Sequence, residues 1–208
     1  MSDEVKARPF IIGLTGSIGM GKTQTARLFA TEGVPVFDAD AAIHRLYRPG
    51  GGAVSIVEKA FPGAIEDGAI DRAALSRLVV EDEGALARLE ALLHPLVAAE
   101  RGAFLRAHAA APIVLFDIPL LLESNVPVDA VVVASAPAHV QRARVMARPD
   151  MSEDKFTRLL ARQMSDAQKR QQAHFVVMTD KGLDHAREQV KMILAEIRSR
   201  QRTENRDA

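Results

Sequence analysis

A glycine-rich run that ends in lysine and threonine is the first feature of this sequence that could do chemistry. Residues 16–23 read Gly-Ser-Ile-Gly-Met-Gly-Lys-Thr and match the pattern G-x-x-x-x-G-K-[ST] in full. Glycines let the backbone turn tightly, so that successive N–H groups point at phosphate oxygens, and a following helix adds partial positive charge. In such a loop Lys22 reaches the β- and γ-phosphates of a nucleotide, and the Thr23 hydroxyl ligates Mg²⁺. The pattern predicts phosphate binding without naming the reaction, because switches, motors and kinases share it.

Three aspartates stand at the ends of apolar runs. Asp38 and Asp40 follow residues 34–37, and Asp117 ends the run 113–117. In open α/β sheets, ligands bind at the carboxyl ends of the strands. One carboxylate there can hold Mg²⁺, and another can orient or deprotonate an acceptor hydroxyl. The alternative is that each aspartate only caps the helix that follows it. Three such residues in a chain with a phosphate loop favour the functional interpretation.

A basic segment follows in the last third of the chain. Its basic residues outnumber its acidic ones by eight to four, and they are Arg142, Arg144, Arg148, Lys155, Arg158, Arg162, Lys169 and Arg170. Phosphoryl transfer needs cations around the transferring group, often from a segment that closes over it. The alternative is a solvated helix face with ion pairs between residues four apart, which would account for Arg158 and Arg162. We expect Arg148, beside Pro149, to contact phosphate.

Five apolar runs are expected to form the strands that position these residues. They are residues 10–14, 34–37, 113–117, 130–134 and 175–178. Helical patterns occur at 22–31 and 39–48, and another closes the chain from Leu183. This alternation predicts an α/β fold, with a parallel sheet covered by helices on both faces. The nearly continuous apolar character of the strands is typical of strands buried on both sides.

The segment 53–110 has no convincing strand. Apolar residues recur there at spacings of three, four and seven, as in an amphipathic helix, at Leu86, Leu89, Leu93, Leu96, Val97 and Phe104. Pro95 lies inside this pattern and is expected to kink or divide the helix. A helical insertion between two strands is the natural interpretation. His94, next to that proline, could face a ligand or fill a kinked turn.

Composition narrows the class of protein further. The 208 residues carry 27 basic and 27 acidic side chains, so the net charge is zero and a general nucleic-acid binder is disfavoured. The 48% apolar and 26% charged fractions are those of a globular chain. No run is long enough to span a bilayer, and the absence of cysteine permits a reducing compartment. We therefore expect a cytoplasmic protein with small-molecule partners and no membrane association.

Further motifs make the sequence resemble the dephospho-CoA kinase family over about residues 10–200. After the second strand they are Asp38-Ala39-Asp40, Ile43 and Arg45. In the helical segment they are Gly68, Asp71-Arg72, Leu75, Leu89-Glu90 and Leu93-His94-Pro95. After the third strand they are Asp117-Ile118-Pro119-Leu120-Leu121 and Glu123. Where the family has its lid they are Gln141-Arg142, Arg148 and Gln163. The sequence departs from the family's usual pattern at Ser17, Met20, Ala173-His174 and Thr179.

The resemblance implies a fold and a reaction. The fold is a single P-loop NTPase-type domain over residues 1–208, whose core comprises about 9–48, 112–140 and 174–200. A helical acceptor-binding insertion spans about 49–110, and a lid spans about 141–172. The reaction is transfer of the γ-phosphate of ATP to the ribose 3′-hydroxyl of dephospho-coenzyme A with Mg²⁺, the final step of coenzyme A synthesis.

The resemblance also implies roles for particular residues. The ATP phosphates would contact Gly16, Ser17, Ile18, Gly19, Met20, Gly21, Lys22, Thr23, Gln24 and Arg142. The acceptor would contact Asp40, Arg45, His94, Pro119 and Leu120. Catalysis would fall to Lys22, Arg148, Asp40 and Asp38. Asp40 would accept or orient the hydroxyl proton, and Asp38 would organise the metal or replace Asp40 as the base. Thr23 and Asp117 would ligate Mg²⁺.

Three other classes of nucleotide-binding protein share parts of this pattern. A kinase of nucleosides or nucleotides would have the same phosphate loop, acid and lid, and would differ in the helical acceptor region. A GTPase switch would carry the strings Asn-Lys-x-Asp and Asp-x-x-Gly, and neither occurs here. A degenerate regulator would have lost catalytic groups, whereas Lys22, Thr23 and the aspartates are all present. A kinase is the preferred interpretation.

Overall fold

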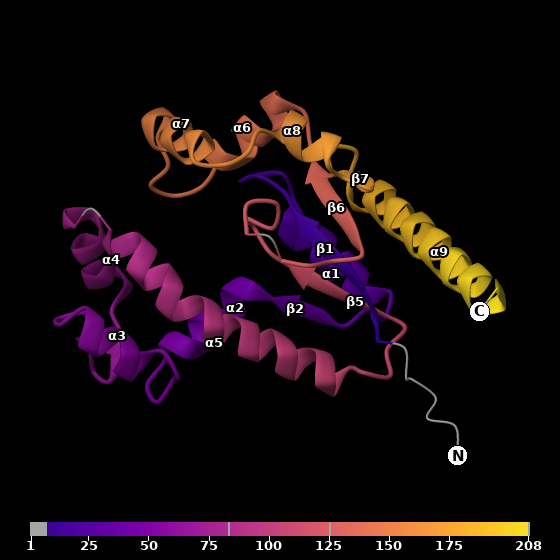
Figure 1. The fold of residues 1–208 in the computed structure, drawn as a ribbon. Helices are drawn as coiled ribbons and strands as arrows, with labels where there is room; N and C mark the ends of the chain where they lie inside the picture. The colour runs from indigo at the N-terminus through magenta and orange to yellow at the C-terminus, as the bar shows by residue number, and fades with distance from the viewer. Residues whose placement is uncertain (1–7, 83, 125, 208) are drawn as a thin grey trace, which may run out of the picture. The chain divides into compact units, whose positions relative to one another are not determined.

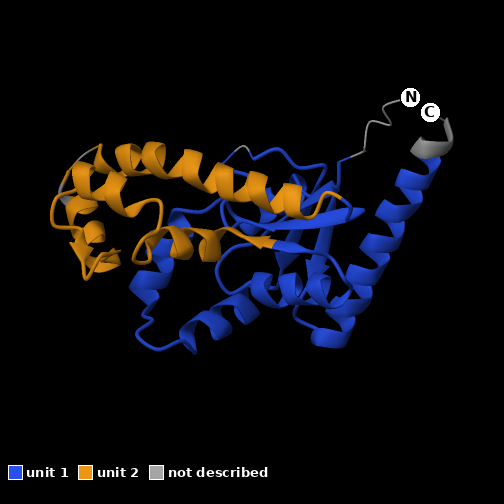
Figure 2. Cartoon of the chain, turned by 90° about the horizontal axis from the view of Figure 1, so that it is seen from below, with its two compact units in different colours: residues 1–36, 110–208 blue, residues 37–109 orange. Residues whose placement is uncertain are grey.

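The chain divides into two compact units. The computed structural model describes residues 8–82, 84–124 and 126–207. The first unit comprises the chain up to residue 36 and from residue 110 onward, and the second comprises residues 37–109 (Figure 2). Each unit is described by itself.

A five-stranded sheet forms the framework of the first unit. Its strand order is β2-β5-β1-β6-β7. The strands are β1 (Phe10–Thr15), β2 (Val36–Asp38), β5 (Ile113–Asp117), β6 (Ala130–Ser135) and β7 (Phe175–Met178). β1 pairs in parallel with β5 and β6, and β6 pairs in parallel with β7. All of β1 except Phe10, and all of β5 and β6, are buried, which is why these runs are apolar on both faces. The predicted parallel sheet is confirmed.

Two long helices cover one part of this sheet. α1 (Lys22–Thr31) packs against α9 (Leu183–Asp207), and α9 also contacts β7 (Figure 1). They share one apolar core with the strands, in which Ile12, Phe29, Val132 and Leu194 are almost fully buried. The predicted basic segment forms three further helices, α6 (Ala138–Met146), α7 (Glu153–Ala161) and α8 (Asp166–Gln171). The core therefore fixes β1 and α1, between which the phosphate loop runs.

The second unit is largely helical and has a core of its own. Its helices are α2 (Ala39–Tyr47), α3 (Val54–Ala60), α4 (Arg72–Glu81) and α5 (Ala85–Ala107). Val57, Phe61, Leu75 and Leu89 are buried together at their centre. Helices α2, α3 and α4 each pack against α5, so this long helix is the central element of the unit.

One prediction for the second unit is wrong, and another is wrong in part. A short antiparallel hairpin, β3 (Ile65–Glu66) and β4 (Ala69–Ile70), lies in the segment expected to hold no strand. Its turn is Asp67-Gly68, and both residues have positive φ, at 49° and 75°, as a two-residue hairpin turn requires. Of the kink or division expected at Pro95, division does not occur, because α5 continues on both sides of it. A proline removes its own N–H from the helix and its ring crowds the carbonyl four residues earlier, and packing of Leu89 and Leu93 in the core favours the helix against these costs.

No helix in the described ranges is long and apolar enough to cross a membrane.

Candidate active site

The phosphate loop joins the central strand β1 to the first turn of α1. Gly19 and Gly21 have φ values of 79° and 88°, in the left-handed region that favours glycine. The Met20 N–H donates to Ser17 O at 3.1 Å and closes a turn within the loop. α1 then begins at Lys22, directly after Gly21. A glycine-rich turn and a helix N-terminus therefore meet at the place where the sequence predicted a phosphate site.

Lys22 and Asp117 form an ion pair at the end of the sheet. Lys22 Nζ lies 2.6 Å from Asp117 Oδ1, and the two side chains are only 16% and 6% exposed. The pairing follows from the topology, because β1 and β5 are neighbours and Asp117 stands opposite Leu14 in their register. A charge-assisted hydrogen bond between shielded groups is short and strong. It holds the lysine ammonium beside the phosphate loop.

Helix α6 supports the phosphate loop through residues one turn apart. Gln141 Nε2 donates to Ile18 O at 2.8 Å. Arg144 Nη1 lies 3.4 Å from Gly19 O and donates to Thr179 Oγ1 at 2.8 Å, while its Nη2 donates to Thr179 O at 2.7 Å. Sequence reasoning missed Arg144 as a site residue. The available signal was helical phase, because Arg144 shares a face with Gln141 whereas Arg142 does not.

Close packing explains why glycine is needed in the loop. A Cβ on Gly19 would lie 2.5 Å from a Val145 methyl group and 3.0 Å from Gln141 O. A Cβ on Gly21 would lie 2.9–3.0 Å from the Thr179 side chain. The loop therefore packs directly against α6 and against Thr179, the residue after β7.

The departures from the family's pattern have structural roles. Thr179 Oγ1 donates to Met20 O at 2.9 Å, so this threonine hydroxyl ties the end of β7 to the loop. Met20 is buried beneath the loop, and its Sδ accepts the Ala136 N–H at 3.2 Å. His174 Nδ1 accepts the Val131 N–H at 3.1 Å at the start of β7.

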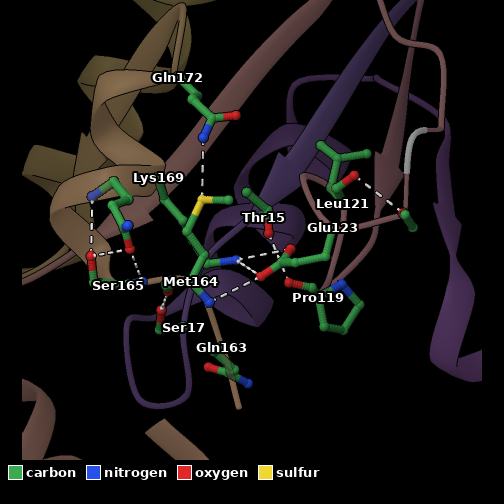
Figure 3. Close-up of polar contacts among 12 residues, drawn as sticks. Thr15, Ser17, Pro119, Leu121, Glu123, Gln163, Met164, Ser165, Lys169 and Gln172 are labelled. Atoms are coloured by element: carbon green, nitrogen blue, oxygen red, sulfur yellow. Dashed lines mark hydrogen bonds and ion pairs between the residues drawn. The ribbon is translucent and has the colours of Figure 1, made fainter. Parts of the chain in front are cut away.

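The connection between α7 and α8 also lies against the phosphate loop. Ser17 Oγ lies 3.5 Å from Met164 O (Figure 3). Gln163 Oε1 accepts the Ile18 N–H at 3.2 Å. Arg142 pairs instead with Glu153, on the exposed surface between α6 and α7. Arg148 is exposed on the connection between these two helices. Within the described ranges its side chain makes no hydrogen bond or ion pair.

The loop after β5 carries the predicted acceptor residues of the first unit. Pro119 O accepts a hydrogen bond from Thr15 Oγ1 at 2.8 Å, which fixes the start of this loop to the end of β1. Leu120 is 44% exposed, which is unusual for a leucine beside a buried strand. The predicted phosphate-binding residue Gln24 is exposed in the first turn of α1.

The remaining predicted site residues belong to the second unit. Asp38 is the N-cap of α2, where its carboxylate accepts the Ala41 N–H at 2.9 Å. Asp40 is exposed in the first turn of the same helix, and its carboxylate makes no hydrogen bond to any residue that the structure describes. Arg45 pairs with Glu100 at 2.9 Å, and His94 is exposed in α5. Asp38 therefore caps α2, and Asp40 does not.

Two side chains next to Lys22 carry oxygen atoms that could ligate Mg²⁺. The Thr23 hydroxyl is exposed in the first turn of α1, and the Asp117 carboxylate lies against Lys22 Nζ. Mg²⁺ prefers such oxygen ligands and commonly takes only one or two from protein, with phosphates and water completing its shell. In the described part of the chain, no group of three or more His, Cys, Asp or Glu side chains could hold a metal. The residues present fit an ion bound jointly with nucleotide phosphates.

A phosphate loop between the central strand of a parallel sheet and its first helix defines a P-loop nucleotide-binding protein. Comparison with known proteins identifies the family. The sequence model of the dephospho-CoA kinases matches residues 10–185, and the chain belongs to that family. Kinases of this family use ATP.

Individual relatives agree with this assignment over nearly the full length of the chain. A dephospho-CoA kinase of Cereibacter sphaeroides is 55% identical over 193 residues, which cover 92% of this chain and 97% of that protein. One of Mesorhizobium japonicum is 52% identical, with coverage of 90% and 96%. The crystal structure of TT1252 from Thermus thermophilus matches with a TM-score of 0.80 and 34% identity, over 91% of this chain and 98% of that one.

Proposed function

We propose that this chain phosphorylates the ribose 3′-hydroxyl of dephospho-coenzyme A with ATP, giving coenzyme A and ADP, and that Lys22, Asp40 and Arg148 carry the step. Family membership supports the reaction. The observation that carries the proposal is the ion pair between Lys22 and Asp117, which holds a shielded ammonium at the start of α1. A cation preorganised there stabilises charge that develops on the transferring phosphoryl group.

The proposed step breaks one bond to phosphorus and forms another. The acceptor 3′-oxygen bonds to the γ-phosphorus as the bond from that phosphorus to the bridging oxygen breaks, and ADP leaves with that oxygen. The hydroxyl proton passes to a carboxylate, for which Asp40 is the candidate. The N–H groups of the phosphate loop and the Lys22 ammonium bind the phosphate oxygens and orient the γ-phosphorus.

Asp40 is a better candidate for the base than Asp38. The Asp38 carboxylate already accepts the Ala41 N–H and caps α2. Asp40 is exposed, and no described residue hydrogen-bonds its carboxylate, so it is available to accept a proton. We assign acceptor binding to Arg45, His94, Pro119 and Leu120, and contacts with ATP to Gln24 and Arg142.

Thr23 and Asp117 are the residues that would hold Mg²⁺. When bound, Mg²⁺ would neutralise negative charge on the β- and γ-phosphates. Asp117 would then serve two cations, since its carboxylate also pairs with Lys22. We also propose that the protein acts in the cytoplasm, with which a chain lacking cysteine is compatible.

The test is formation of ADP with different acceptors. The purified protein is incubated with ATP and Mg²⁺, with and without dephospho-coenzyme A, and against a panel of nucleosides and nucleotides. We expect rapid ADP formation only with dephospho-coenzyme A, and a product that carries its new phosphate on the 3′-oxygen. Preference for a nucleoside or nucleotide would overturn the proposal in favour of another class of P-loop kinase.

A further inference from the structure

An ion pair between a fully buried lysine and a partly exposed glutamate joins the loop after β5 to helix α8. Lys169 Nζ lies 3.0 Å and 3.3 Å from the two carboxylate oxygens of Glu123 (Figure 3). The Lys169 side chain has no exposed surface, while the Glu123 side chain is 27% exposed. Glu123 Oε1 also accepts the Met164 N–H at 3.2 Å. One carboxylate therefore holds both α8 and the connection that precedes it.

The charge state of Glu123 follows from these contacts. Burial alone would raise the pKa of Glu123, but the hydrogen bonds from Lys169 and the Met164 N–H, with the lysine charge, outweigh burial and lower this pKa. The carboxylate is thus ionised at neutral pH. Burying the Lys169 ammonium is a costly way to stabilise a fold, because desolvation of that charge opposes its attraction to the carboxylate. The pair is therefore better explained by the backbone that it holds in position than by a contribution to stability.

The residues that Glu123 holds contact the phosphate loop. Met164 donates its N–H to Glu123, and the carbonyl of the same residue lies 3.5 Å from Ser17 Oγ. The preceding residue, Gln163, accepts the Ile18 N–H. Ser17 and Ile18 belong to the loop that binds phosphate. Glu123 thus lies one residue away from the contacts that shape this loop.

The other end of the same short segment holds Lys22. Asp117, which pairs with Lys22, is followed within six residues by Glu123. The segment between them is itself anchored, because Thr15 Oγ1 donates to Pro119 O and Ser124 Oγ donates to Leu121 O. One anchored segment therefore carries both the carboxylate that pairs with Lys22 and the carboxylate that holds Met164.

We propose that Glu123 is a positioning residue for ATP, acting through Met164 and Gln163 on the phosphate loop. The pair with Lys169 fixes the carboxylate, and the carboxylate fixes the backbone of the connection between α7 and α8. The proposal rests on the proposed function only in that ATP is the nucleotide bound. The proposal is tested by measuring ATP binding, which requires no acceptor. A negative result would therefore contradict the role of Glu123 and leave the assignment of the acceptor unaffected.

The decisive variant replaces both charges with apolar side chains of similar size. In Glu123→Leu/Lys169→Met neither buried charge is left unpaired, so the thermal midpoint is expected to stay near that of the parent chain. The Met164 N–H nevertheless loses its acceptor. We expect the Kd for ATP, measured by calorimetry, to rise about tenfold, as for the loss of a hydrogen bond to a charged group. The KM for dephospho-coenzyme A should change by less than about twofold, because no acceptor contact is altered.

A second variant keeps the proposal testable if the double variant does not fold. Glu123→Gln keeps an oxygen at the position that accepts both the Met164 N–H and the Lys169 ammonium, so the buried lysine retains a hydrogen-bond partner while the negative charge is removed. We expect a smaller rise in the Kd for ATP, about threefold, with faster hydrogen exchange at residues 162–165. A Kd for ATP equal to that of the parent chain in the folded double variant would overturn the proposal. If only Glu123→Gln folds, an unchanged Kd in that variant would do the same.

The chain offers a matched control for general effects of removing such a pair. The Asp129 carboxylate pairs with Arg8 at 2.7 Å and accepts the Ile11 N–H at 2.7 Å, so it combines one basic partner with one backbone donor, as Glu123 does. Asp129 directly precedes β6 and contacts the start of β1, the end of that strand opposite to the phosphate loop. Arg8→Met/Asp129→Leu should leave the Kd for ATP unchanged. An equal rise in both double variants would show that Glu123 has no specific positioning role.

Discussion

Arg144 and Thr179 form a two-point contact beneath the phosphate loop. Arg144 Nη2 donates to the Thr179 carbonyl at 2.7 Å, and Nη1 donates to its hydroxyl at 2.8 Å. The same hydroxyl donates to Met20 O in the loop. The guanidinium is planar and presents its donors in a fixed geometry, so it can make both contacts at once. Helix α6 is thereby linked to the residue after β7, and through it to the phosphate loop.

This contact predicts that lysine cannot replace Arg144. Arg144→Lys keeps the positive charge but lacks the planar pair of donors, so Thr179 loses at least one of its two contacts. We expect the Kd for ATP to rise about tenfold, because the loop loses part of its support. Isothermal titration with ATP measures the change. Arg158→Lys, at an exposed position of α7, is the control. Equal affinities in the two variants would show that the contact does not support the loop.

Loss of the Lys22 ammonium is expected to abolish most of the turnover. In Lys22→Ala no cation remains at this position to stabilise charge on the transferring phosphoryl group. The loss of one preorganised contact of this kind lowers kcat by at least ~10²-fold. Steady-state ADP release measures this, with the thermal midpoint checked separately because Asp117 loses its ion pair with Lys22. Near-normal turnover would show that this loop is not catalytic.

The elements that carry Lys22 could be predicted because their signals are local. Residues 10–14 are apolar without alternation, as expected of a central parallel strand, and the glycine pattern fixes the start of α1. Asp117 could be placed at a strand end for the same reason. Its pairing with Lys22, 95 residues away, depends on which strands are neighbours in the sheet, and strand order has no local signal.

The residues that sequence reasoning missed depend on helix phase or on distant contacts. Arg142 and Arg144 are equally basic, and only the orientation of α6 decides that Arg144 reaches the loop while Arg142 pairs with Glu153. Lys169 looked like one of several basic surface residues, although it is fully buried against Glu123. The hairpin at residues 65–70 has the favoured Asp-Gly turn, but each strand has only two residues, too few to show alternation.

The two aspartates after β2 are expected to respond differently to the same change. Asp40→Asn should retain ATP binding and lose phosphoryl transfer, because the amide cannot accept the hydroxyl proton. Asp38→Asn should retain both the cap of α2 and the activity, since asparagine caps helices about as well as aspartate. Single-turnover transfer and ATP titration on both variants measure this. Activity in Asp40→Asn together with none in Asp38→Asn would exchange the two roles.

The stability that Asp129 contributes is expected to depend on pH. The hydrogen bond from Arg8 lowers the pKa of Asp129; burial opposes this, while the Ile11 N–H and the arginine charge lower it further. A carboxylate with a lowered pKa in the folded state stabilises the fold above its unfolded pKa, and this contribution disappears as pH falls through the folded pKa. Asp129→Asn should therefore lower the free energy of unfolding at pH 7 and have a smaller effect near pH 3. Urea titrations at the two pH values measure the difference. The same loss at both would contradict the assignment.

Two anchors define the segment that is free to act as a lid. Gln141 and Arg144 attach α6 to the phosphate loop, and Gln163 attaches the end of the connection after α7. Residues 147–161, which include Arg148 and α7, lie between these anchors. The Arg142–Glu153 ion pair links this segment to α6. The pair is solvent-exposed, and such pairs contribute little to stability. We therefore expect movement of residues 147–161 while both anchors stay in place.

Closure of this segment is expected to bring Arg148 onto the phosphates. Closing would exclude water and strengthen the contact between the guanidinium and the γ-phosphate. Because the contact forms mainly in the closed state, Arg148→Ala should lower kcat more than it weakens ATP binding, whereas Arg158→Ala should change neither. Hydrogen exchange provides the independent measurement: protection of residues 147–161 should rise when ATP and an unreactive acceptor analogue bind together. Equal losses in the two alanine variants would indicate general electrostatic attraction, and unchanged protection of this segment would exclude a moving lid.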